Sequence, residues 1–110
     1  MGVMHIVMLS FKPLATPEEI QGVCDSLLAL KDSCVHPETN RPYIKNIMGG
    51  VDTKMSETQD RVTHAFVSEF DSDEDREYYL NTDPVYAAFW DGAKGIVEKT
   101  HAVGFWPGKF

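Results

Sequence analysis

The chain has 110 residues, of which 43% are hydrophobic and 25% charged, and its net charge is −7. This balance is typical of one globular domain and excludes intrinsic disorder, so we assign residues 1–110 to a single domain. The acidic charge opposes phosphate backbones and anionic bilayers, and every apolar run is too short to span a membrane, so we expect neither nucleic acid nor a membrane as a partner.

The first half of the chain predicts a strand, a helix and a second strand. Residues 4–12 alternate between two largely apolar faces, so both faces should be covered. One face carries His5, Val7, Leu9 and Phe11, and the other carries Met4, Ile6 and Met8. Thr16, Pro17 and Glu19 form a capping-box pattern that begins a helix running to about Ser33. Residues 35–42 then predict a loop, and residues 43–51 a strand with a bend or bulge at Gly49-Gly50.

The second half predicts a strand, a divided helix and a last strand. Residues 52–60 are polar, and either a lid or an idle surface loop fits them. Residues 62–70 follow as a strand whose one face carries Val62, His64, Phe66 and Phe70. Ser72 and the acidic residues after it indicate a helix start rather than a metal site, because carboxylates in a first turn complement the helix dipole. The helix breaks before Pro84, resumes over residues 85–97, and precedes a strand at 99–106.

This order, β-α-β-β-α-β, predicts an α+β ferredoxin-like fold with a four-stranded antiparallel sheet. Both helices of such a fold lie on one face of the sheet. We expect the other face to be lined by Val7, Leu9, Phe11 and Phe66. A bare apolar face of this size requires a partner, so we expect a homodimer through the sheet face and the last strand, closing into a barrel.

The cysteines and the motif spacings indicate a reducing compartment and no cofactor. Cys24 and Cys34 lie on or near one predicted helix, about 15 Å apart along its axis, which is too far for a disulfide. The sequence has no CxxC, HExxH or His-x-His spacing and no glycine-rich phosphate loop. The N-terminus lacks the pattern of a signal peptide. We therefore expect a cytoplasmic protein without a metal or an organic cofactor.

Several short motifs occur in order along essentially the whole chain. They are His5-Ile6-Val7, Phe11-Lys12, Thr63-His64-Ala65-Phe66, Glu69-Phe70, Tyr78-Tyr79, Asp83-Pro84 and Phe105-Trp106-Pro107-Gly108. This set resembles the stress-responsive dimeric α/β-barrel (Dabb) family, and His36-Pro37-Glu38, Pro42-Tyr43-Ile44-Lys45 and Gly49-Gly50 resemble its fungal members. The resemblance implies a dimeric barrel in a family that mixes a few enzymes with many proteins of unknown role.

The same resemblance implies candidate site residues. The plant olivetolic acid cyclase, a distantly similar member, folds a linear polyketide by a cofactor-free aldol reaction. Its catalytic tyrosine corresponds to Tyr79, its catalytic histidine to Tyr86, and an aspartate common on the last strand to Gly104. Two further pocket histidines correspond to His5 and His64. The candidate catalytic residues are His5, His64, Tyr79 and Tyr86, and the candidate substrate-binding residues are Val7, Leu9, Phe66, Phe89 and Trp90.

An aldol cyclisation requires a base and a hydrogen-bond donor to the developing oxyanion. A tyrosine with a pKa of ~10 is a poor base at neutral pH, whereas a histidine with a pKa of ~6.5 suits that role. We therefore expect His5 or His64 to be the base and Tyr79 and Tyr86 to be donors, although each of these residues also fits a packing role.

Three functions stay open. The first, which we favour, is a cofactor-independent enzyme of polyketide or other secondary metabolism, a lyase-type cyclase that promotes cyclisation or rearrangement of a hydrophobic substrate in the barrel pocket. The second is a non-catalytic stress-responsive dimer or a protein that binds a hydrophobic ligand. The third is a cofactor-free monooxygenase.

Overall fold

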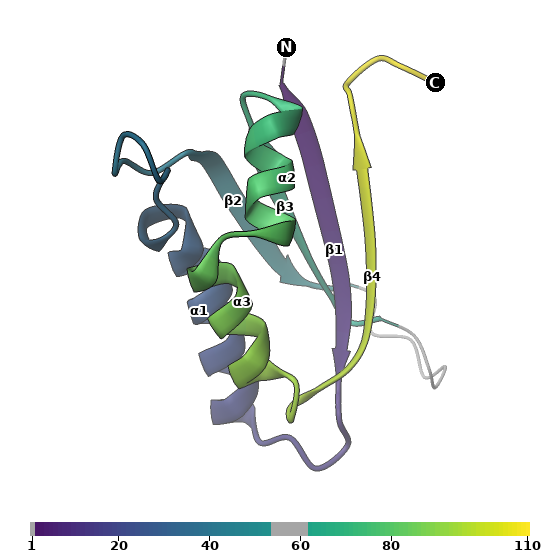
Figure 1. The fold of residues 1–110 in the computed structure, drawn as a ribbon. Coiled ribbons are helices and arrows are strands. Elements are labelled where there is room, and N and C mark those ends of the chain that lie inside the picture. The colour runs from purple at the N-terminus through teal and green to yellow at the C-terminus, as the bar shows by residue number, and fades with distance from the viewer. Residues whose placement is uncertain (1, 54–61) are drawn as a thin grey trace.

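The computed structural model describes residues 2–53 and 62–110 and shows a ferredoxin-like α+β fold whose second helix is divided (Figure 1). The strands are β1 (Val3–Phe11), β2 (Ile44–Val51), β3 (His64–Phe70) and β4 (Val97–Phe105), and the helices are α1 (Pro17–Ser33), α2 (Asp73–Asn81) and α3 (Pro84–Ala93). The strands form one antiparallel sheet in the order β2-β3-β1-β4. Residues 54–60 of the possible lid lie outside the described residues.

Side-chain caps begin the helices as the sequence predicted. Thr16 Oγ1 accepts a hydrogen bond from the Glu19 backbone N–H at 3.1 Å, and Glu19 Oε1 accepts one from the Thr16 N–H at 2.9 Å. This reciprocal capping box begins α1. Ser72 Oγ accepts from the Asp75 N–H at 3.2 Å, which begins α2. The acidic run after Ser72 is therefore a first turn, as expected.

Two boundaries differ from the prediction. Helix α3 ends at Ala93 rather than near residue 97, and β4 begins at Val97. The Ile96 N–H donates to the Ala93 carbonyl at 2.9 Å in a tight turn that includes Gly95, a residue with low helix propensity. In β2, the register shift lies between Ile44 and Asn46 and not at the glycine pair.

Gly49 has a different role from the predicted bend or bulge. It pairs in register with Phe66 of β3, and a Cβ at this position would overlap the Phe66 ring. Glycine therefore lets the aromatic ring lie directly on the neighbouring strand. The sequence identified Gly49 as a position where glycine is needed. The reason is the close approach of the Phe66 ring to the backbone, and not a bend or bulge of the strand.

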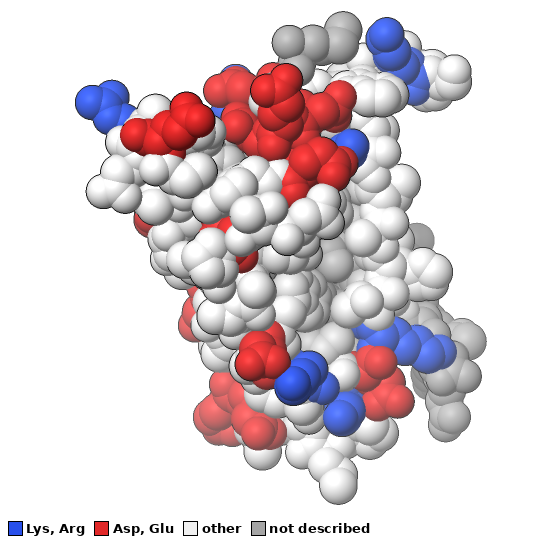
Figure 2. Space-filling model, viewed as in Figure 1, with Lys and Arg blue, Asp and Glu red and all other residues white. Residues whose placement is uncertain are grey.

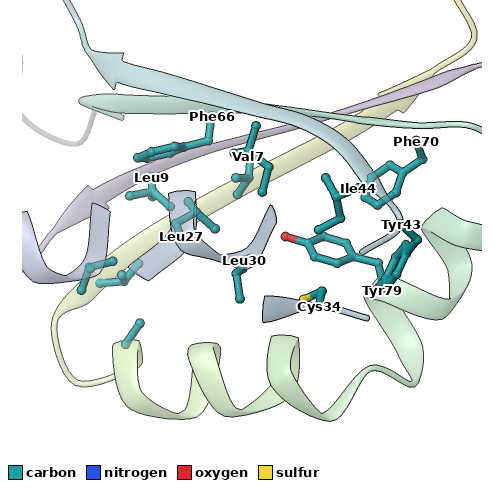
Figure 3. Packing of buried hydrophobic residues seen from close by; sticks show 14 of the residues in the cluster. Val7, Leu9, Leu27, Leu30, Cys34, Tyr43, Ile44, Phe66, Phe70 and Tyr79 are labelled. Carbon is teal, nitrogen blue, oxygen red and sulfur yellow. The ribbon is translucent and has the colours of Figure 1, made fainter. Parts of the chain in front are cut away.

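The buried core lies between the sheet and α1, and it corrects the predicted bare face. Leu9 and Phe66 are 0% and 2% exposed, and they share a buried cluster with Leu27 and Leu30 of α1 (Figure 3). Val7 is also buried, and Phe11 packs against this cluster. The prediction that these strand residues line the uncovered face is wrong. Alternation groups residues by face, but it cannot decide which of two apolar faces meets the helices.

The uncovered side of the sheet, here called the open face, carries the other set of β1 side chains. Its apolar residues are Met4, Ile6, Met8, Met48, Val67, Val103 and Phe105. Strand pairing places Ile6 between Val67 and Val103, and Val103 is 52% exposed. A contiguous exposed apolar surface of this kind marks an interaction surface. None of the described helices has the length and hydropathy needed to cross a membrane.

Candidate active site

A cavity of about 260 Å³ lies between the helices and the edge of the sheet formed by β1 and β4. It is lined by His5, Val7, Leu80, Tyr86, Trp90, Thr100 and Ala102. The cavity exists because β4 is an edge strand that the helices leave largely uncovered, as Figure 1 shows. Among the residues of β4, Val97 alone is buried. The sheet thus supplies a floor, and α2 and α3 supply one wall.

His5 is the titratable group on the floor of this cavity. It lies on β1, is 6% exposed, and its ring centroid is 6.3 Å from that of Tyr79 in an edge-on arrangement. Burial lowers the pKa of His5 from its usual value of 6.5, and the nearby positive charge of Arg76 lowers it further. The imidazole is therefore neutral at neutral pH and has a ring nitrogen that can accept a proton.

Tyr79 and Tyr86 meet at the junction of the two short helices. Their ring centroids are 4.1 Å apart, and Tyr86 lies 6.3 Å from Trp90 on the next turn of α3. Burial raises the pKa of Tyr79, which is 2% exposed, and the neighbouring Tyr86 raises it further. Burial also raises the pKa of Tyr86, against a hydrogen bond from Trp90. Both phenols therefore keep their protons at neutral pH and are able to donate hydrogen bonds.

His64 does not share the cavity with His5. Both face the helices, but His5 pairs with Ser68 and His64 pairs with Leu9, which separates them by about 13 Å along the strands. The His64 ring packs edge-on against Phe11 at 5.0 Å, and its Nδ1 lies 2.8 Å from Thr63 Oγ1. Burial lowers the pKa of His64. The two predicted pocket histidines thus lie on the same face of the sheet but have different neighbours.

The predicted substrate-binding residues also separate into groups. Val7 and Trp90 line the cavity. Leu9 and Phe66 lie in the core beneath α1. Phe89 lines a groove between α1 and α3 on the outer side of the helical layer. Of the five predicted substrate-binding residues, two therefore line the cavity and three lie elsewhere.

Sequence reasoning missed three polar residues around the cavity. Thr100 lines it from β4, and Ser68 contributes a hydrogen bond that acts on the Tyr79 phenol. Arg76 lies close enough to His5 to lower its pKa. A signal for Arg76 was present, because it precedes Tyr79 by three residues on α2 and so falls on the same helix face.

A buried hydrogen bond fixes the start of α3. The Tyr43 hydroxyl donates to Asp83 Oδ2 at 2.6 Å, and Asp83 Oδ1 accepts from the Val85 N–H at 2.8 Å. Burial and the adjacent Asp83 raise the pKa of Cys34 to about 12, so this thiol stays protonated and unreactive. Both Cys34 and Cys24 are free, which confirms the expected absence of a disulfide. Within the described residues, no group of three potential metal ligands gathers.

Comparison with known proteins gives one family match and several similar folds. A family model described as Stress responsive A/B Barrel Domain (Dabb) matches residues 3–107. No functionally curated protein matches the chain.

Three solved structures illustrate the likeness of fold. The Arabidopsis thaliana protein At3g17210 is 24% identical with a TM-score of 0.80, and the match covers 98% of this chain and 97% of that one. A hydroxynitrile lyase from Passiflora edulis is 21% identical with a TM-score of 0.80, covering 99% and 96%. A dimeric ferredoxin-like protein of unknown function from Thermobifida fusca is 23% identical with a TM-score of 0.71, covering 96% and 90%.

Proposed function

The chain belongs to the stress responsive A/B barrel family, and we propose that it is a cofactor-independent enzyme that moves a proton on a hydrophobic carbonyl compound. The reaction class is cyclisation or rearrangement of a polyketide-like substrate, as in the secondary metabolism suggested by the resemblance to olivetolic acid cyclase. The observation that carries the proposal is the presence of neutral His5 and protonated Tyr86 in the lining of one apolar cavity, with the Tyr79 ring packed against Tyr86 behind it.

The chemistry follows from these protonation states. His5 accepts the acidic proton next to a carbonyl group, and the electron pair of the broken C–H bond moves to the carbonyl oxygen. Tyr86, with Tyr79 behind it, donates a hydrogen bond to the enolate oxygen that forms. The enolate carbon then attacks a second carbonyl of the same chain, and the proton held by His5 returns to the new alkoxide. No redox step is required.

The cavity favours a small or narrow reacting segment. Its volume of about 260 Å³ is just below the usual range for ligand pockets, which begins at about 300 Å³. Val7, Leu80 and Trp90 supply apolar contacts, whereas Thr100 of β4 adds a hydroxyl from the sheet. A buried histidine next to one buried and one half-buried phenol is costly in such a space unless the polar groups are used, which favours an enzyme over a structural dimer.

The test is exchange of the α-protons of a β-ketooctanoyl thioester of N-acetylcysteamine in D₂O, followed by proton NMR. The protein is expected to accelerate exchange, and Tyr86→Phe is expected to lower the rate about ten- to a thousandfold, because the phenol that lines the cavity no longer donates to the enolate. Phenylalanine keeps the ring contacts with Tyr79 and Trp90, so the fold should stay intact.

The alternatives give different results in the same assay. Tight binding of the thioester without proton exchange would support a non-catalytic ligand-binding protein. Consumption of oxygen with a suitable aromatic substrate would support a monooxygenase. Circular dichroism of the Tyr86→Phe variant checks that a slower rate does not come from unfolding.

We also propose that the chain forms a homodimer through its open face and resides in the cytoplasm, where its two cysteines stay reduced. The Thermobifida fusca protein of the same fold is dimeric. Ile6→Glu should place like charges near the twofold axis and weaken the dimer at least about a hundredfold. Light scattering should then give the monomer mass of 12.4 kDa.

Leu28→Glu is the matched control for this substitution. Leu28 is also apolar and is 39% exposed, but it lies on α1, on the opposite side of the molecule from the open face. The control should leave the mass of the dimer unchanged. A 12.4 kDa mass for the unsubstituted chain at micromolar concentration would contradict the dimer.

A further inference from the structure

We infer that Arg76 of α2 forms an anion subsite at the end of the cavity, and that the substrate carries a carboxylate group near the carbon that reacts. The inference names the substrate class for the site and rests on the proposed function of that cavity. Three observations support it: the position of the guanidinium group, its unused hydrogen-bonding capacity, and the glycine that makes room for it.

The guanidinium group of Arg76 lies against the residue of β4 that pairs with His5. Gly104 of β4 pairs with His5 of β1, on the side of the sheet that faces the helices. A Cβ at Gly104 would overlap Nη1 of Arg76, so the guanidinium rests directly on this part of β4. Ala102, two residues earlier on the same face of β4, lines the cavity together with His5. The positive charge therefore stands beside His5, the proposed base, which itself lines the cavity.

The protein leaves much of this guanidinium unpaired. The Arg76 side chain is 18% exposed, and within residues 2–53 and 62–110 its buried Nε has no hydrogen-bond partner. Its Nη2 lies 3.4 Å from Asp73 Oδ1, which is longer than the about 2.7–2.9 Å of a charge-assisted hydrogen bond. The Asp73 carboxylate is also shared, because Trp106 Nε1 donates to its two oxygens at 3.0 and 2.9 Å.

An unpaired buried donor on a charged group is costly, and a carboxylate is the ligand that fits it. The planar guanidinium presents paired donors that match the two oxygens of a carboxylate. Rotation of the side chain away from Asp73 would bring those donors toward the cavity at little cost, since the existing ion pair is long and partly exposed.

The side chains around Arg76 on α2 are mostly acidic, so anion binding there would depend on Arg76 itself. Acidic side chains gather at the end of the molecule where α2 begins (Figure 2), and Asp73, Glu74, Asp75 and Glu77 flank Arg76 along the helix. This region does not attract anions in general. Binding of an anion at the cavity must therefore depend on the single guanidinium, and one substitution is enough to test it.

The test compares benzoate with benzamide, which have nearly the same shape but differ in charge. Binding is followed by the NMR shifts of the backbone amides of Ala102 and Gly104. Benzoate should bind at least about tenfold more tightly than benzamide, and Arg76→Gln should remove this preference while benzamide binding is unchanged. Gly104→Ala should do the same, because its Cβ displaces the guanidinium.

Two further variants sharpen the result. Asp73→Asn keeps an acceptor for Trp106 but removes the competing charge, so it should tighten benzoate binding about two- to fivefold. Arg41→Gln removes an exposed positive charge from the loop before β2 and should change nothing. The amide spectrum of each variant shows whether it is folded.

Equal affinity for the two probes would overturn the subsite, and so would a benzoate preference that persists in Arg76→Gln. Failure of both probes to bind would also overturn it. Neither probe has an α-proton to exchange. A benzoate preference in a protein without turnover would therefore support the subsite against the proposed enzyme, whereas turnover of the thioester without that preference would do the reverse.

Discussion

His5→Gln is expected to lower the rate of α-proton exchange about a hundred- to ten thousandfold, the usual contribution of a general base. Glutamine has a size similar to histidine and can form hydrogen bonds, but it cannot take up a proton near neutral pH. His5 is suited to the role because it faces the cavity and because burial and Arg76 keep its imidazole neutral. The measurement is the exchange rate at saturating thioester, together with circular dichroism to verify the fold.

His64→Gln is the matched control. It changes the second half-buried histidine of the same sheet face, whose pKa burial also lowers, but which packs against Phe11 outside the cavity. Sequence reasoning left the base open between His5 and His64. In the structure His5 lines the cavity and His64 does not, so the rate of His64→Gln should stay close to that of the unsubstituted chain. A larger loss at His64 than at His5 would contradict the assignment of the base.

The pH dependence provides a second readout of the same assignment. A base acts in its neutral form, so the rate should be full above the pKa of His5 and fall as the pH drops through it. Because the pKa is below 6.5, the loss should occur on the acidic side of that value. Arg76→Gln removes the repulsive charge that disfavours the imidazolium ion, so it should raise the pKa of His5. The loss of rate on the acidic side of the pH profile should then begin at a higher pH. A profile that does not move would place the guanidinium too far from His5 to act on it.

The fold could be predicted from the sequence because its signals are local. Thr16 and Glu19 define a capping box within one turn, and Ser72 and Pro84 define two further helix boundaries in the same way. The order of the elements then leaves few arrangements of a four-stranded sheet. The face of the sheet that meets the helices was not predictable in this way, because β1 is apolar on both sides.

The candidate site was only half predictable for a related reason. His5 and Tyr79 were identified from the family resemblance, and Tyr86 from its departure from it. Their meeting depends on the turn between α2 and α3, which brings rings on two separate helices to 4.1 Å. Arg76 was missed because an arginine among acidic residues is typical of an exposed helix face. The Arg76 guanidinium can be buried because Gly104 has no side chain in its place. Gly104 is distant from Arg76 in the sequence, and the pairing of β4 with β1 brings it into this region.

The turn between the two helices depends on a buried pair, and Asp83→Ala is expected to lower the free energy of unfolding by about 2–4 kcal/mol. The substitution has two costs. It removes the cap of α3, because Asp83 Oδ1 accepts from the Val85 N–H. It also leaves the buried hydroxyl of Tyr43 without its acceptor at 2.6 Å. Chemical denaturation followed by circular dichroism measures the change.

Ser72→Ala is the matched control, because Ser72 caps α2 through the same kind of bond but has no second buried partner in the described structure. It should cost only about 1 kcal/mol, the usual value of a cap. Tyr43→Phe removes the hydroxyl from the other end of the pair, and combining it with Asp83→Ala should cost less than the sum of the two, since both remove one hydrogen bond. Additive losses, or an Asp83→Ala variant no less stable than Ser72→Ala, would contradict this account. In that case the position of Tyr86 beside Tyr79 would have to come from packing of the rings themselves and not from the anchored start of α3.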